Sequence, residues 1–257
     1  MKKITKLICL ILALCLTAIC FAGCTSKDNT QAPDTAEDSV LKMATNAAFP
    51  PYEFKEGEKF VGIDVEIAEA IAEKLGSKLE VVDMEFDSII TSVQEGETDF
   101  GMAGMTVTDE RKEQVDFTSS YATGVQSVIV KEDSTIASID DLEGKKIGVQ
   151  LGTTGDFYAT DDYGAENVTQ YGKGADAVIA LTGGDVDAVI IDNEPAKAFV
   201  AANEGLKILD TEYAVEDYAI AVKKGNTELL DKINGALEAL AADGTIDNIV
   251  AKYINAD

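Results

Sequence analysis

Short apolar runs alternate with amphipathic segments from residue 40 onward. Residues 41–45 and 79–82 have the length and composition of β-strands, whereas residues 64–75 repeat apolar side chains at helical spacing. Gly76 follows that helix where a left-handed cap is common, and residues 88–94 predict the next helix. Strands that alternate with helices predict an α/β fold with mainly parallel sheets.

The pattern repeats in the second half of the chain. Residues 96–104 run glycine, acid, any residue, aspartate and then an apolar strand, and residues 184–192 repeat this order 88 positions later. Residues 41–46 and 145–150 form a second similar pair. We interpret the repeat as two lobes of similar plan, and a chance recurrence of strand–helix–strand patterns is the alternative.

Two strand-like segments, residues 126–131 and 217–222, lie between the halves. The helical patterns at 227–241 and 245–254 have no counterpart in the second half, so we expect them to return the chain to the first lobe. Two crossings make a hinge, and a cleft between hinged lobes is a natural ligand site. The expected lobes are residues 40–127 with 216–257, and residues 128–215.

The composition of the chain excludes several classes of function. The 257 residues include 47 acidic and 21 basic side chains, giving a net charge of −26, which argues against a nucleic-acid partner. Histidine is absent, which excludes a histidine general base, a histidine triad and histidine-ligated metal. With 46% hydrophobic residues, the chain has enough apolar material for a large core.

The first 23 residues predict a secretory signal. Three lysines precede an apolar run at residues 7–22, which ends in small residues before Cys24. A membrane-spanning anchor is the alternative, but the run is short for one. Residues 21–24 (Phe-Ala-Gly-Cys) resemble a bacterial lipobox, although Phe21 stands where an aliphatic residue is usual. That resemblance implies a lipoprotein with an acylated (palmitate-type) Cys24, held at the outer face of the cell membrane.

The cysteines support this interpretation. All four, at positions 9, 15, 20 and 24, lie in or beside the signal, so the mature chain retains one. A disulfide framework, a zinc cluster and a buried catalytic thiol are therefore excluded, and we expect no cofactor and no metal. Residues 24–39 lack apolar periodicity and predict a flexible tether.

Several motifs, taken together, resemble one protein family. They are residues 44–54 (ATNAAFPPYEF), 62–75 (GIDVEI and the helix after it), 104–111 (GMTVTDER), 148–154 (GVQLGTT), 187–192 (DAVIID) and 252–253 (KY). In this order they are similar to family 3 of the bacterial extracellular solute-binding proteins. The resemblance implies a type II periplasmic binding fold and a monomer that binds a free polar amino acid. It also implies an ABC permease with its ATPase as partners, and no enzymatic activity.

Arg111 is the first candidate ligand residue. It is the only arginine in the chain, and the other 20 bases are lysines. One arginine among many lysines indicates a position that needs the planar guanidinium, which binds a carboxylate through two parallel hydrogen bonds. An exposed helix residue paired with a nearby acid is the alternative. We expect removal of Arg111 to weaken ligand binding and to change stability little.

The resemblance supplies the rest of the amino acid site. It implies that Thr106 and Thr154 offer backbone N–H groups to the carboxylate, and that Asp192, with the Gly104 carbonyl and the Thr106 hydroxyl, receives the ammonium. A structural helix cap is the alternative for Asp192. Phe49 and Phe86 are expected around the ligand side chain, with core packing as the alternative. The remaining expected ligand residues are Asn46, Glu53, Ala103, Met105, Gln150 and Thr153.

The identity of the amino acid is less constrained. Many such receptors for cationic or amide ligands carry aspartate where this chain has Asn46, which weakens the case for a cationic ligand. The amides of Asn46 and Gln150 suit a neutral side chain such as glutamine, while Glu53 keeps a cationic ligand open. Cystine is a further possible ligand. A cyclohexadienyl dehydratase-like enzyme on the same fold is the rival function, with Glu53 as its one candidate general acid.

Overall fold

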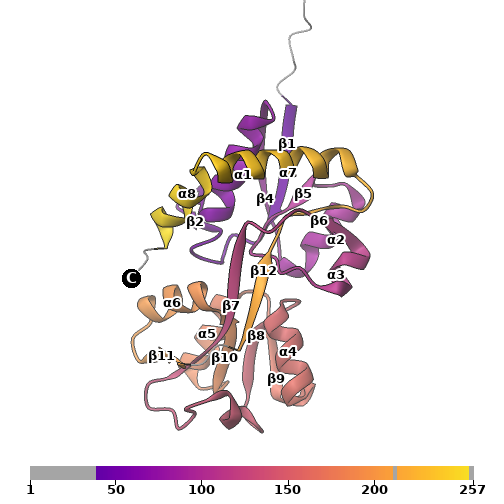
Figure 1. Ribbon diagram of the computed structural model, residues 1–257. Helices are drawn as coiled ribbons and strands as arrows, with labels where there is room; N and C mark the ends of the chain where they lie inside the picture. The colour runs from indigo at the N-terminus through magenta and orange to yellow at the C-terminus, as the bar shows by residue number, and fades with distance from the viewer. Residues whose placement is uncertain (1–38, 211–212, 255–257) are drawn as a thin grey trace, which may run out of the picture. The chain divides into compact units, whose positions relative to one another are not determined.

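The computed structural model describes residues 39–210 and 213–254, whose strands form two main sheets (Figure 1). In the first sheet the strand order is β4 (Ser77–Asp83), β1 (Ser39–Thr45), β5 (Phe100–Gly101), β13 (Ala221–Lys223) and β6 (Val115–Phe117). β1 pairs in parallel with β4 and β5, whereas β13 is antiparallel to β5 and β6. A separate hairpin joins β2 (Phe54–Glu56) to β3 (Lys59–Val61). The predicted signal, and Cys24 with it, lies outside the described residues.

In the second sheet the order is β11 (Leu206–Ile208), β7 (Ala122–Lys131), β10 (Ala188–Asp192), β8 (Ile147–Gln150) and β9 (Val168–Tyr171). β12 (Ala214–Tyr218) also pairs with β7. β8 is parallel to both its neighbours, whereas β7 is antiparallel to all of its own. The expected α/β architecture with parallel strands is therefore confirmed, and one strand in each sheet, β13 and β7, runs opposite to its neighbours.

Helices accompany each sheet. The first sheet is associated with α1 (Ile63–Lys74), α2 (Ile89–Glu95), α3 (Asp109–Gln114), α7 (Thr227–Ala242) and α8 (Thr245–Tyr253). The second carries α4 (Thr154–Tyr163), α5 (Gly174–Gly183) and α6 (Asn193–Ala202). Short 3-10 helices occupy Phe86–Ser88, Ile139–Leu142 and Ala165–Asn167.

Helix α1 shows why the apolar spacing was informative. The side chains that the period-3.6 pattern puts on one face, including Ile67, Ala68 and Ile71, are buried. Asp64 and Glu66 lie in the first turn, where negative charge favours the helix dipole. Gly76, just past the end, has a φ of 69°, which glycine adopts without strain. The helix starts one residue earlier than predicted.

The predicted strand at 217–222 is wrong as a single element. The chain leaves β12 at Tyr218, passes through the fully buried Ala219 and Ile220, and enters β13 in the other sheet at Ala221. The Ala219 N–H donates to the Met105 carbonyl, and the Ile220 N–H donates to the Thr118 hydroxyl. Residues 218–222 are all apolar and buried, so the sequence gives no sign of the point at which the chain moves from one sheet to the other.

Strands β7 and β12 run side by side where the chain passes between the two sheets (Figure 1). Their register joins Ala214 to Gln126 and Tyr218 to Ala122. The expected lobe boundaries, between 127 and 128 and between 215 and 216, fall inside these two strands. α7 and α8 pack against α1 and against each other, which brings the C-terminal helices to the first sheet.

The repeated glycine–acid–X–aspartate segments have the same local structure. Gly96 and Gly184 both end a helix in the left-handed conformation. The Asp99 carboxylate accepts from the Lys42 N–H at 2.7 Å, and the Asp187 carboxylate accepts from the Lys146 N–H at 2.9 Å. In each half, one aspartate therefore ties the start of a buried strand to the neighbouring strand of its sheet.

Candidate functional site

A pocket is lined by residues from elements of both sheets. The lining residues are Asn46, Phe49, Glu53, Phe86, Ala103, Gly104, Thr106, Arg111, Gln150, Thr153, Thr154 and Asp192. These are all of the expected ligand residues except Met105. The Met105 side chain is fully buried in a core cluster with Ala44, Ile89 and Val115. The structure thus collects the expected residues in one place, and their roles toward a ligand stay predictions.

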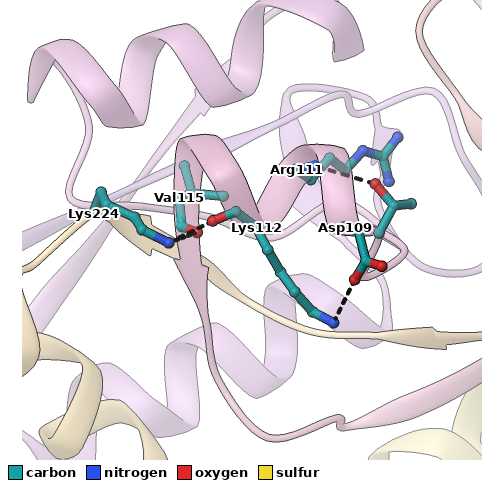
Figure 2. Close-up of polar contacts among 6 residues, drawn as sticks. Asp109, Arg111, Lys112, Val115 and Lys224 are labelled. Atoms are coloured by element: carbon teal, nitrogen blue, oxygen red, sulfur yellow. Dashed lines mark hydrogen bonds and ion pairs between the residues drawn. The ribbon is translucent and has the colours of Figure 1, made fainter.

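Arg111 reaches the pocket from the short helix α3. Thr108 begins this helix, and its hydroxyl accepts from the Arg111 N–H at 3.2 Å. At the other end, the Lys224 ammonium donates to the carbonyls of Lys112 and Val115, and Lys112 pairs with Asp109 on the surface (Figure 2). Both ends of the helix are held, so the base of the arginine side chain is fixed.

The Arg111 guanidinium is buried, with 4% of the residue exposed. Its Nη1 donates to the Thr106 carbonyl at 2.7 Å, and its Nη2 donates to the Gly152 carbonyl at 3.0 Å. The group lies 5.3 Å from the centre of the Phe86 ring, within cation–π range. The alternative of an exposed, surface-paired arginine is therefore wrong.

Burial lowers the pKa of Arg111 to about 10, while the charges of Glu216 and Asp192 act in the opposite direction. The guanidinium thus keeps its charge at neutral pH.

Asp192 ends strand β10, at the carboxyl edge where parallel sheets present ligand groups. It occupies the N-cap position of α6, but its side chain makes no capping hydrogen bond. The carboxylate instead accepts from the Tyr218 hydroxyl. Burial raises the pKa of Asp192 to about 7, so a nearby cation would shift it toward the ionised form. The structural cap that we considered as the alternative is not what this side chain does.

Glu216 is a buried member of the site that was not predicted from the sequence. Its Oε2 accepts from the Thr106 hydroxyl at 3.1 Å, the Thr154 hydroxyl at 2.9 Å and the Gln126 amide at 3.0 Å. Its Oε1 accepts from the Tyr158 hydroxyl at 2.9 Å. A carboxylate on strand β12 therefore orients two threonines that were expected to contact the ligand.

The burial pattern of β12 explains why the sequence did not single out Glu216. Along β12, Glu216 and Tyr218 point inward, whereas Val215 between Ala214 and Glu216 is 64% exposed. An acid on the buried face of a strand with an apolar residue outside inverts the usual alternation. Such an inversion indicates a buried polar contact, because a buried charge requires partners.

Asn46 and Gln150 join the ends of β1 and β8. Gln150 Nε2 donates to Asn46 Oδ1 at 3.0 Å and also approaches the Gly172 carbonyl at 3.3 Å. Asn46 Nδ2 donates to the Met84 carbonyl at 2.7 Å. Both side chains are buried. Much of their hydrogen-bonding capacity is thus used within the protein, which leaves less for a ligand amide.

Glu53 is 1% exposed and lies on the wall of the pocket. Its backbone is fixed by paired hydrogen bonds with Phe49 at 2.8 and 3.1 Å. Within the described residues, no N–H or O–H group donates to either oxygen of the ionised carboxylate. Burial and the charge of neighbouring Asp64 raise the pKa of Glu53 well above its ordinary value. Asp64, also missed from the sequence, is buried at the start of α1.

The remaining lining residues shape the pocket. Gly104 has a φ of 53°, and a side chain there would meet the Phe49 ring at 3.1 Å. Thr153 caps α4 by accepting from the Asp156 N–H at 3.3 Å. Over residues 39–210 and 213–254, no group of three or more acidic or cysteine side chains is placed to hold a metal ion. Over the same ranges, no helix is long and apolar enough to cross a membrane.

Known proteins are similar to this chain in sequence and in architecture. The sequence model of the bacterial extracellular solute-binding proteins, family 3, matches residues 41–256. The arginine-binding extracellular protein ArtP of Bacillus subtilis is 34% identical over 262 residues, which cover 98% of this chain and 99% of the relative. An ancestral arginine-binding protein bound to glutamine has a TM-score of 0.81 and 44% identity, covering 85% of this chain and 99% of that one.

A third similarity bears on the enzymatic alternative. The structure of an ancestral amino acid-binding protein, a precursor of cyclohexadienyl dehydratase, has a TM-score of 0.77 and 34% identity over 84% of this chain and 95% of that one. The expected two-lobe binding-protein fold is confirmed by these similarities.

Proposed function

Because the chain belongs to family 3 of the bacterial extracellular solute-binding proteins, we propose that it captures one α-amino acid in the pocket that Arg111 and Asp192 line and delivers it to an ABC permease with its ATPase. Amino acid binding for an ABC transporter, outside the cytoplasm, is the property of the family. The observation that carries the proposal is one buried guanidinium and one buried carboxylate, Arg111 and Asp192, on the wall of a single pocket. Together they complement the two charges of a zwitterion.

The contacts of each group support this assignment. Arg111 uses two of its five N–H donors on backbone carbonyls, which leaves three for a carboxylate. The Thr106 hydroxyl donates to Glu216, so its oxygen lone pairs stay available to an ammonium. Thr154 begins α4, where free backbone N–H groups favour an anion. The ligand carboxylate is thus assigned to Arg111 and Thr154, and the ammonium to Asp192 and Thr106.

For the ligand side chain, we favour a cation such as that of arginine. Among the described residues, Arg111 is the one buried cation, whereas five acids are buried: Glu53, Asp64, Asp156, Asp192 and Glu216. Glu53 faces the pocket without a donor, and a cationic side chain would supply one. Glutamine, which we expected from Asn46 and Gln150, is the second candidate, because one similar structure holds glutamine.

A thermal-shift screen of the twenty amino acids and cystine tests the proposal. A ligand that binds only the folded protein raises stability by RT ln(1 + [L]/Kd), which is about 2.7 kcal/mol at 100 times Kd. We expect arginine to give the largest rise in Tm and glutamine a smaller one. No shift with any of these compounds would contradict amino acid capture. Dehydration of a cyclohexadienyl substrate by the purified protein would instead support the dehydratase, with Glu53 as its acid.

We further propose that Cys24 is acylated and is the membrane attachment of a monomeric receptor. Cys24→Ser should leave protein without lipid label and either unprocessed or released into the medium, because the lipobox cysteine provides the acylated sulfur. The measurement is metabolic labelling with a fatty acid analogue, followed by fractionation. Label that persists in the Cys24→Ser protein would show that another residue carries the lipid.

A further inference from the structure

Two buried carboxyl groups, Glu53 on the wall of the pocket and Asp64 at the start of α1, have unequal partners. The Asp64 N–H donates to the carbonyl of Tyr52 at 2.9 Å, which places Asp64 beside the residue that precedes Glu53. Asp64 Oδ2 accepts from the Gly104 N–H and from the Tyr121 hydroxyl, each at 2.8 Å. Asp64 Oδ1 and both oxygens of Glu53 receive no donor from the described residues when both acids are ionised. Leaving these oxygens buried without donors is costly, and a proton shared between the two carboxyls removes much of that cost.

The proton belongs on Glu53. Burial raises the pKa of Glu53 most, and the charge of Asp64 and a hydrogen bond with it raise it further. Burial also raises the pKa of Asp64, to about 6, but the bonds from Gly104 and Tyr121 oppose that rise. A neutral Glu53 would donate its proton in a hydrogen bond to the Asp64 carboxylate, so both groups would gain a partner.

The groups around Glu53 favour its protonated form. Asp64 on α1 and Asp192 at the end of β10 are the charged groups that act on it, and both are negative. Tyr52, in the same turn, and Tyr121, ahead of β7, are phenols whose pKa values are raised by burial, so they stay neutral. A neutral ligand side chain would leave Glu53 protonated. A buried cation on the ligand would favour the ionised form of Glu53, because a cation beside an ionised carboxylate is far more stable than one beside a neutral acid.

We propose that capture of a cationic amino acid expels the Glu53 proton into solution, whereas capture of a neutral amino acid leaves that proton in place. In this exchange the Glu53 O–H bond breaks, the proton passes to buffer, and no covalent bond forms with the ligand. The N–H groups of the ligand cation then donate to the Glu53 oxygens. This inference rests on the proposed function, since it assumes an amino acid in this pocket.

Calorimetric titration in buffers of different ionisation enthalpy measures the proton count directly. At about pH 6, arginine should release roughly one proton more than glutamine, because only the cation ionises Glu53. Asp192 also ionises when an ammonium binds beside it, but this contribution is common to both ligands and cancels. Since the complex holds fewer protons, the affinity for arginine relative to glutamine should rise with pH, by up to about tenfold per unit, and level off above the Glu53 pKa.

Glu53→Gln should abolish the difference in proton release between the two ligands. Glu56→Gln, the same substitution on an exposed residue of β2, should preserve it. An infrared difference spectrum of the wild-type protein provides a second readout that needs no variant. Both ligands should bleach the protonated-carboxyl C=O band of Asp192, and arginine should bleach one further such band, that of Glu53.

The outcomes separate this inference from the function on which it rests. Equal proton release with arginine and glutamine, or a difference that survives in Glu53→Gln, would overturn the role of Glu53 while amino acid capture stands. If the protein binds neutral amino acids and no cationic one, the role of Glu53 is also overturned, while amino acid capture stands. No heat with any amino acid would instead reject the proposed function.

Discussion

Arg111→Ala should reduce affinity for the best amino acid ligand by more than about tenfold. The variant leaves the ligand carboxylate buried without its charged partner, and truncating one member of a buried ion pair costs about 2–5 kcal/mol. Arg111→Lys should also weaken binding, although it keeps the charge, because a lysine ammonium cannot form the two parallel bonds of a guanidinium. Calorimetric titration of both variants with the same ligand measures the two losses.

Lys112→Ala is the matched control for Arg111→Ala. Lys112 is the next residue of α3 and carries the same charge, but its side chain is on the surface beside Asp109 (Figure 2). An exposed pair of this kind contributes about 0–1 kcal/mol, so Lys112→Ala should bind the ligand as the wild type does. Unchanged affinity in Arg111→Ala would place the carboxylate site elsewhere.

The structure revises our expectation that Arg111→Ala changes stability little. That expectation assumed an exposed side chain, whereas the guanidinium is buried and bonded to the carbonyls of Thr106 and Gly152. Its removal leaves both carbonyls short of a donor and Glu216 short of a nearby positive charge. Folding stability of the ligand-free variant should therefore be measured alongside affinity, and we now expect it to fall.

Asp192→Asn should likewise cost about 2–5 kcal/mol in ligand binding. The substitution keeps the size of the side chain and an oxygen that can accept from Tyr218, but it removes the negative charge opposite the ligand ammonium. The loss should be similar for arginine and glutamine, because both carry the same α-ammonium group. Titration of both ligands against this variant checks the magnitude and the equality.

Asp185→Asn serves as the control for Asp192→Asn. It removes one negative charge from the same part of the chain, but from an exposed residue between α5 and β10. We expect wild-type affinity in that variant. A large loss for arginine with none for glutamine in Asp192→Asn would mean that Asp192 contacts the ligand side chain and not its ammonium.

Regular elements were predictable where local periodicity agreed with burial. The apolar spacing of α1 reflects one face turned to the core, whereas the short apolar run of β1 ends in residues that are buried on both faces of the sheet. The break between β12 and β13 was not predictable in this way, because Ala219 and Ile220 are apolar and as fully buried as Tyr218 and Ala221 on either side of them. Only the pairing partners of each segment, which are distant in sequence, distinguish one sheet from the other.

The residues of the site also fall into those that the sequence identified and those that only the folded structure reveals. Arg111 stood out from composition, and the motifs of the family brought in most of the other lining residues. Glu216 could not be reached through those motifs, because its contact with Thr106 spans 110 positions and exists only when β12 lies beside β7. The interaction of Glu53 with Asp64 required knowing that both carboxyl groups are buried and close enough for the charge of one to act on the other.

The two aspartates that tie strand to strand, Asp99 and Asp187, provide internal references for amide exchange. The Lys42 and Lys146 N–H groups that they hold each bond within a single sheet, so a movement of one lobe against the other leaves both bonds intact. The exchange rates of these amides therefore report the opening of each lobe by itself. A ligand that slows exchange in β7 and β12 but not at these two amides acts on the connection between the sheets.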